Sequence, residues 1–119
     1  MDIEIVREYC LAKKGTEECL PFDEFSLVIK VMGKMFILID LEGTNMICVK
    51  CDPEYALELR EQYHSIEGAY HFNKKYWNQI ILDGDANEKL IKKLIDHSYE
   101  EVIKKFTKKL RAEYDALPE

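Results

Sequence analysis

Residues 70–82 read YHFNKKYWNQIIL and hold the side chains of this sequence best suited to contact a ligand. Lysines can neutralise phosphates, Asn73 can hydrogen-bond a base edge or a sugar, and aromatic rings can stack on bases. The rings could equally belong to the core, because aromatics contribute much of its buried area. We expect the single tryptophan, Trp77, to be mainly buried. The exposed cluster that remains is His71, Asn73, Lys74 and Lys75.

A second group of cations lies near the C-terminus, with no acidic residue among them. It consists of Lys104, Lys105, Lys108, Lys109 and Arg111. Cations at the end of a helix favour its dipole and aid solubility, so the group also has a purely structural interpretation. If it lies beside residues 70–77 in the fold, its four lysines would extend the first cluster into one phosphate-binding surface.

The cysteines and histidines lack the spacing of a metal or catalytic centre. Cys48 and Cys51 form a C-x-x-C pair, but residues three apart in a strand point to opposite faces, and a structural zinc site needs a second such pair. The sequence has no serine in a nucleophile-elbow context, no phosphate loop, no glycine-rich nucleotide fingerprint and no HExxH. We therefore expect no metal, no cofactor and no enzymatic activity.

Length and composition indicate one globular domain. The 119 residues can bury a self-sufficient core, which we assign to residues 1–112, with residues 113–119 as a frayed tail. The net charge of −6 is unusual for a protein that binds nucleic acid, although a local basic patch would suffice. The charged N-terminus is not a secretory signal, and no apolar run approaches the roughly 20 residues of a membrane span. These features predict a cytoplasmic protein with no membrane contact.

The first half of the chain predicts a helix followed by antiparallel strands. Asp2 is suited to cap the helix, and Gly15 to stop it. Residues 25–31 and 34–41 are rich in β-branched and aromatic residues around a credible Met32-Gly33 turn, and a further strand covers 45–51.

The two faces of this hairpin depend on its loop length. A two-residue turn places Leu27, Ile29 and Val31 on the face of Phe36 and Leu38. The other face would then hold Val28, Lys30, Met35, Ile37 and Ile39. A three-residue loop would sort these residues differently. In either case one face must pack on helices, and the other is half apolar and could serve as a docking surface.

The second half predicts helices on either side of one more strand. Asp52 and Pro53 begin a helix that runs to about Tyr63. A strand over 77–82 follows, and the spacing of Asp85 and Glu88 predicts the start of a long amphipathic helix. Asp96-His97-Ser98 could instead cap a second helix within that segment. The element order predicts an α+β two-layer sandwich, with an antiparallel sheet packed on helices.

Five runs of the sequence resemble the MmcQ/YjbR-like family, small bacterial domains that carry a DNA-binding label. The runs are REYCLAKKG (7–15), GKMFILIDLEG (33–43), KCDPEYALELREQY (50–63), YHFNKKYWNQIILDG (70–84) and LIKKLIDHSYEEVIKKFTKKLR (90–111). They cover nearly the whole chain in the family's order. The departures are small: Glu67-Gly68-Ala69 stands where family members often carry Pro-Gly, and Tyr76 is a variable position.

The resemblance implies a fold similar to frataxin and CyaY, and a "double-wing" arrangement for binding DNA. The motif that carries over consists of Tyr70, His71, Asn73, Lys74, Lys75, Trp77, Asn78, Ser98 and Tyr99. No catalytic role comes with it, and several of these residues could be structural. A shared fold does not determine function.

Three kinds of partner therefore remain. We expect weak, largely non-specific DNA binding through His71, Asn73, Lys74 and Lys75, helped by Lys104, Lys105, Lys108 and Lys109. The alternative is a protein-interaction module that binds another protein or a second copy through its half-apolar sheet face. A frataxin-type iron binder would use acids of the first helix, such as Asp2, Glu4 and Glu8.

Overall fold

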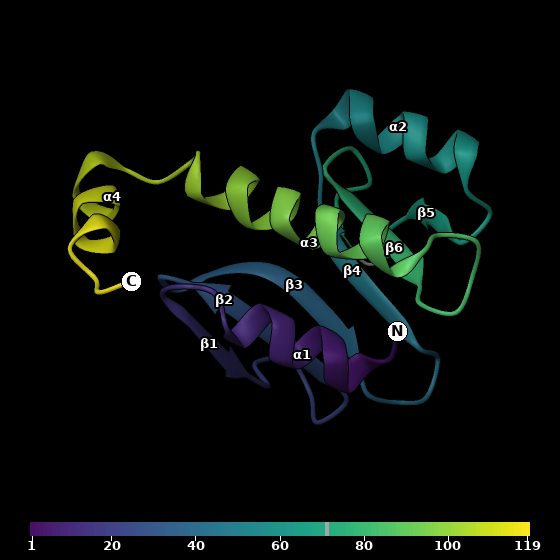
Figure 1. Cartoon of the computed structure of the whole chain (residues 1–119), viewed down its shortest axis with the longest axis horizontal. Coiled ribbons are helices and arrows are strands. Elements are labelled where there is room, and N and C mark those ends of the chain that lie inside the picture. Colours follow the sequence, from purple (N-terminus) through teal and green to yellow (C-terminus); the bar gives the residue numbers. More distant parts are fainter. Residues whose placement is uncertain (71) are drawn as a thin grey trace.

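The computed structural model describes residues 1–70 and 72–119, which form four helices and six strands (Figure 1). In chain order these are α1 (Ile3–Leu11), β1 (Thr16–Cys19), β2 (Ser26–Val31), β3 (Lys34–Asp40), β4 (Met46–Lys50), α2 (Pro53–Gln62), β5 (Ile66–Gly68), β6 (Trp77–Ile81), α3 (Glu88–Ile103) and α4 (Lys108–Asp115).

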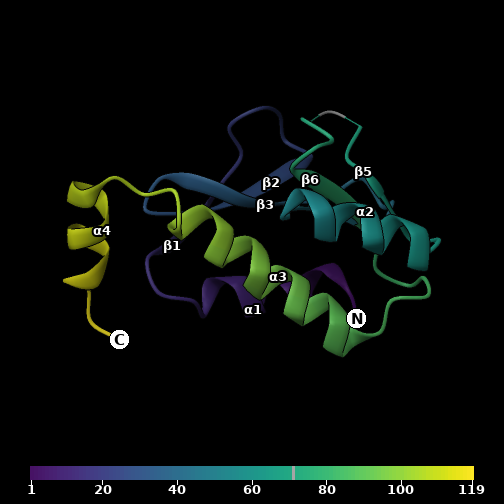
Figure 2. The same cartoon turned by 90° about the horizontal axis from the view of Figure 1, so that it is seen from above.

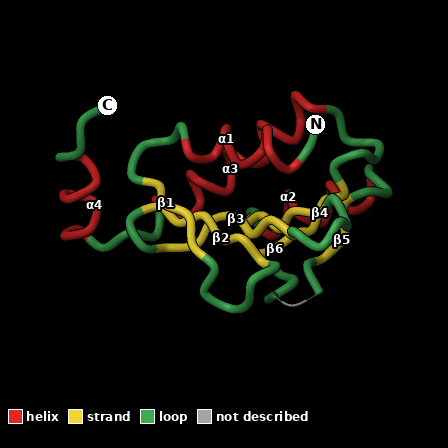
Figure 3. The backbone as a smooth tube through the Cα atoms, turned by 90° about the horizontal axis from the view of Figure 1, so that it is seen from below, coloured by secondary structure: helices red, strands yellow, loops and turns green. Residues whose placement is uncertain are grey.

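The strands form one antiparallel sheet in the order β1-β2-β3-β4-β6-β5. Helices α1 and α3 cover one face of it, and the β1–β2 and β5–β6 loops project from the other face (Figure 3). Buried residues of α1, α2 and α3 share a single core with the inner sheet face. The predicted α+β two-layer sandwich is confirmed.

Helix starts follow the capping residues, with one difference. Asp2 accepts a hydrogen bond from the amide of Ile5 at 2.9 Å, and Asp52 caps α2 with Pro53 in its first turn, as predicted. Helix α3, however, is capped by Asn87. Asp85, two residues earlier, accepts hydrogen bonds from the amides of residues 64 and 65, so it fixes the preceding loop instead of the helix.

The β2–β3 turn has two residues, as the sequence predicts. Met32 and Gly33 both adopt positive φ, 50° and 81°, which is the backbone of the tight turns that match strand twist. Between this turn and the middle of the hairpin, Ile29 pairs with Ile37, and Lys30 pairs with Met35. Phe36 therefore has no partner of its own, which is a β-bulge.

The bulge corrects the predicted faces of β3. One extra residue reverses the alternation of side chains beyond it. Ile37 and Ile39 consequently lie in the core beneath the helices, whereas Leu38 lies on the outer face. The outer face that we expected to carry Met35, Ile37 and Ile39 instead carries Met35 and Leu38, beside Val28.

Helix α4 extends to Asp115, past residue 113, where the sequence predicts fraying. Tyr114 explains the difference, because its ring packs edge-on against Phe106 and its hydroxyl lies 2.8 Å from that of Tyr99.

Among residues 1–70 and 72–119, no helix combines the length and the apolarity that crossing a membrane requires.

Three buried thiols should make the protein less stable in alkali. Burial raises the pKa of Cys10, Cys48 and Cys51 to about 12 each, from an ordinary value of 9.0. Above pH 9.0 these thiols ionise in the unfolded chain but remain neutral in the folded one, which favours unfolding. The free energy of unfolding should therefore fall as the pH rises toward 12.

Urea denaturation at about pH 8 and about pH 11 measures this change. The variant Cys48→Ala should lose less stability between the two pH values, because one of the three thiols is absent. An unfolding free energy that is equal at both pH values would contradict the assignment.

Candidate functional site

The β5–β6 loop holds the exposed polar residues that the sequence singles out. Asn73, Lys74 and Lys75 are exposed there, and His71 lies outside the described residues. The Asn73 side chain accepts a hydrogen bond from the amide of Lys75 at 3.0 Å. Its backbone carbonyl accepts two more, from the amides of residues 76 and 77. Asn73 therefore shapes the turn that presents the two lysines.

Arg60 of α2 ties this loop to the body of the protein. Its guanidinium donates to Asn78 Oδ1 at 2.6 Å, to the carbonyl of Lys74 and to the carbonyl of Trp77. Asn78 is buried, and its amide nitrogen donates to the carbonyl of Ala56. The motif residue Asn78 thus has a structural position between α2 and β6.

Replacing Arg60 should destabilise the protein and loosen the lysine-bearing loop. In Arg60→Met the buried Asn78 oxygen loses its donor, which costs about 1–3 kcal/mol. Urea denaturation measures the loss of stability. The rate of proteolytic cleavage within residues 70–76 measures how far the loop has loosened. As a control, Arg111→Met removes an exposed arginine that pairs with Asp115 and lies over the Tyr114 ring, and it should cost under about 1 kcal/mol. Equal losses in the two variants would contradict the assigned role.

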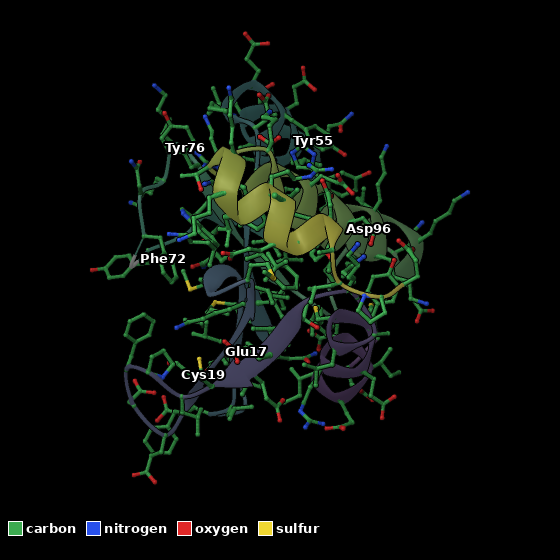
Figure 4. All side chains as sticks on the ribbon, turned by 90° about the vertical axis from the view of Figure 1, so that its left-hand side faces the viewer. Glu17, Cys19, Tyr55, Phe72, Tyr76 and Asp96 are labelled. Carbon is green, nitrogen blue, oxygen red and sulfur yellow. The ribbon has the colours of Figure 1, made fainter. Side chains whose placement is uncertain are left out.

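Trp77 is half-buried, less than the sequence leads us to expect. It stacks on Phe72 with ring centroids 5.1 Å apart, and both rings pack against the outer sheet face. The lysine ammonium groups also lie over rings, Lys74 over Tyr70 at 5.8 Å and Lys75 over Tyr76 at 5.5 Å. In Figure 4, Phe72 and Tyr76 lie on the side of the sheet away from Asp96 of α3.

Four further lysines gather where the β2–β3 turn meets the link between α3 and α4. Lys34, Lys50 and Lys105 line a hollow of about 370 Å³, floored in part by Val102. Lys34 and Lys105 also line a second hollow of about 470 Å³, together with Lys109 and one acid, Glu113. The two hollows share residues and are therefore neighbours. We call Lys34, Lys50, Lys105 and Lys109 the lysine strip.

The lysine strip reaches the start of β6. Lys50, the last residue of β4, pairs with Trp77, and the amide of Cys51 donates to the carbonyl of Tyr76 at 2.7 Å. Lys75 therefore lies in the segment that directly adjoins the strip. The chain thus runs from Lys74 and Lys75 directly into the strand that pairs with β4 at Lys50.

The C-terminal lysines differ in how freely their ammonium groups could contact a ligand. Lys104 pairs with Glu101 at 2.7 Å, and this hydrogen bond raises the pKa of Lys104. Lys108 is exposed but lines neither hollow. Within the described part of the chain, the salt bridges include no member of the lysine strip.

Ser98 and Tyr99 of α3 have structural partners. The buried Ser98 hydroxyl donates to the carbonyl of Phe36 at 2.5 Å and accepts from the amide of Lys50 at 2.8 Å. The Tyr99 hydroxyl donates to the carbonyl of Lys14 at 2.5 Å. Ser98 therefore fixes the backbone of a strip lysine, while Tyr99 fixes the turn after α1.

Lys34 and Lys50 are the functional candidates that sequence reasoning missed. Each lies at one end of a strand: Lys34 directly follows the Met32-Gly33 turn, and Lys50 is the last residue of β4, two residues before the cap Asp52. Because β3 and β4 are antiparallel neighbours, the start of one lies beside the end of the other. That rule, applied to exposed lysines at strand ends, would have placed them together.

The cysteine pair does not form a site. Cys48 packs on the outer sheet face, and Cys51 packs in the core beneath the helices. Their thiols therefore point apart. In residues 1–70 and 72–119, the structure groups no three His, Cys, Asp or Glu side chains in a way that could hold a metal ion.

Comparison with known proteins shows relatives along most of the chain. The model of a family described as YjbR matches residues 11–101. The chain is 32% identical over 104 residues to the uncharacterized protein YjbR of Escherichia coli K12, covering 87% of this chain and 88% of that protein. It is 34% identical over 101 residues to the uncharacterized protein YbdF of Escherichia coli O157:H7, covering 84% and 83%.

Solved structures share the fold. The crystal structure of Deinococcus radiodurans protein DR2400 matches with a TM-score of 0.90 and 36% identity, covering 98% of this chain and 89% of that one. The crystal structure of a Pseudomonas syringae protein matches with a TM-score of 0.72 and 28% identity, covering 85% and 98%.

Proposed function

The chain belongs to the YjbR family, and we propose that it is a non-enzymatic, cytoplasmic DNA-binding domain that contacts phosphates through the lysine strip and the neighbouring Lys74 and Lys75. The observation that carries this proposal is the gathering of lysines from β3, β4 and the C-terminal segment around two adjoining hollows, with the loop of Lys74 and Lys75 leading into the strand that pairs with β4 at Lys50. Asn73 supports the contact by shaping the loop. Lys104, which is paired with Glu101, contributes less than we expected from the sequence.

Charge explains how an acidic protein can bind a polyanion. The net charge is −6, yet no salt bridge within the described residues neutralises the strip. Lysines that neutralise phosphates release condensed counterions, and this release supplies most of non-specific affinity. The strip lies on strand ends, on the link between α3 and α4 and in the first turn of the short helix α4, with no long recognition helix, so base reading is not expected.

A gel-shift titration at several salt concentrations tests the proposal. We expect both single- and double-stranded DNA to bind at low salt with little sequence preference, and the dissociation constant to reach roughly 1–100 µM at physiological salt. Binding should weaken steeply between about 50 and 200 mM salt. The absence of a shift with either DNA at low salt would remove the proposal.

A further inference from the structure

A second surface lies on the outer face of the sheet, between the β1–β2 and β5–β6 loops. Both loops project away from α1 and α3 and face each other across the sheet (Figure 2). Between them runs a groove of about 510 Å³. Its floor is formed by Leu38, Met46 and Cys48, and Phe22 and Phe72 flank it from opposite loops. The volume is that of a typical ligand site.

Large apolar side chains are exposed both in the groove and around it. Phe22 is 66% exposed and Tyr70, which also lines the groove, is 75% exposed. Leu20, Phe25 and Leu41 are exposed as well, on and beside the β1–β2 loop. Large apolar side chains gathered on one surface are typical of a contact with a macromolecule, because a small ligand in the groove would leave most of them in water.

The groove is negative, in contrast to the lysine strip. Asp23, Asp40 and Glu42 line it, and no lysine or arginine does so among the described residues. Two of the carboxylates are held in place: Asp23 accepts from the amides of Phe25 and Ser26, and Asp40 accepts from the amide of Glu42. The hydrogen bond from the amide of Phe25 also lowers the pKa of Asp23.

We propose that this groove docks a basic, apolar peptide segment of a protein partner, in which leucine-like side chains alternate with arginine or lysine. The apolar side chains pack on Leu38, Met46 and the flanking rings, and the cations meet the three carboxylates. Aromatic rings such as Phe22 also attract a guanidinium placed over their faces. A polyanion would be repelled here, so the groove and the lysine strip take opposite partners.

The test uses fluorescein-labelled peptides and the full chain. The first peptide alternates leucine and arginine, the second replaces its arginines by glutamate, and the third replaces its leucines by serine. Fluorescence anisotropy should show binding of the first peptide, and at least about tenfold weaker binding of the other two. Unlabelled leucine–arginine peptide should also change the emission of Trp77, because that single tryptophan stacks on Phe72 of the groove.

Matched variants locate the binding. Phe22→Ser and Glu42→Lys, both at exposed groove residues, should each weaken the binding of the leucine–arginine peptide about tenfold. Their controls on α2 likewise replace an exposed apolar residue by serine and an exposed glutamate by lysine: Leu57→Ser and Glu54→Lys should change affinity less than about twofold. Thermal melting confirms that all four variants fold.

Three results would overturn the proposal. One is no anisotropy change with any peptide, and another is equal binding of the three peptides. The third is an equal loss in the groove variants and the α2 controls. A second copy of this chain as the occupant would overturn it as well: light scattering would then show a mass that rises with concentration in the wild type but not in Phe22→Ser, while peptide affinity stays unchanged in that variant.

Discussion

Ser98→Ala should lower the free energy of unfolding by about 2–4 kcal/mol, a large part of the stability of a domain of this size. The serine hydroxyl is the partner of two backbone groups, the carbonyl of Phe36 and the amide of Lys50. Phe36 is the bulged residue of β3, and the β3–β4 register ends at the pair of Ile37 and Val49. The sheet ladder therefore provides neither group with a substitute.

The cost follows from leaving the buried carbonyl of Phe36 and the partly buried amide of Lys50 without a partner, at about 1–2 kcal/mol each. Urea denaturation measures it, and the melting temperature should fall by about 10 °C. Ser26→Ala is the matched control, because the Ser26 hydroxyl makes one long hydrogen bond to Asp23 at an exposed position and should matter little. A loss below about 0.5 kcal/mol for Ser98→Ala would mean that water replaces the hydroxyl.

The double variant Lys50→Glu, Lys105→Glu should weaken DNA binding by roughly a hundredfold at about 50 mM salt. The two lysines line the same hollow, so a phosphate placed there would contact both. Each lost contact forfeits counterion release, and each new carboxylate repels the phosphate chain. Fluorescence anisotropy with a labelled duplex measures the change, and thermal melting verifies the fold.

The control for this variant must change the net charge equally. Lys89→Glu, Lys93→Glu does so on exposed residues in the first half of α3, about 20 Å along the helix from Lys105. We expect it to weaken binding only a fewfold, by long-range repulsion. An equal loss in the two double variants would indicate a general charge effect and contradict a local strip.

Much of the fold follows from local signals that act within a few residues. Asp2, Asp52 and Pro53 predict two helix starts, and the Met32-Gly33 turn predicts the hairpin, because caps and tight turns depend on short-range chemistry. The question left open at Asp96-His97-Ser98 is resolved by tertiary contacts. The His97 ring accepts a hydrogen bond from the amide of Asp52, and Ser98 faces the sheet, so α3 continues through both.

The structure differs from the sequence predictions where contacts between distant segments of the chain determine the local structure. Strand β1, with the sequence TEEC, has a charged edge-strand pattern and pairs only with β2, so its own residues gave no strand signal. Strand β5, at the other edge of the sheet, has only three residues, and these gave no strand signal either. The carbonyl of the bulged residue Phe36 accepts a hydrogen bond from Ser98, which lies 62 residues later in the chain. No pattern within the hairpin predicts that contact.

The candidate site also combines features that residue type predicts with features that depend on strand pairing. The exposure of Asn73, Lys74 and Lys75 could be predicted from residue type alone. The position of their loop next to the end of β4 could not, because it requires the β4–β6 pairing that places Lys50 beside Trp77. The acidic groove was missed for the same reason, since its carboxylates come from the β1–β2 loop, the end of β3 and the loop that follows β3.

The salt dependence of DNA affinity, measured for the wild-type protein and for single lysine-to-glutamine variants of Lys34, Lys50, Lys105 and Lys109, tests the central claim most directly. A lysine that contacts a phosphate contributes about 0.9 to the slope of log K against log salt. Each variant should therefore have a slope shallower by about one, while Lys89→Gln should keep the wild-type slope. Slopes that are unchanged in all four strip variants, or a wild-type protein that does not bind DNA, would contradict the account.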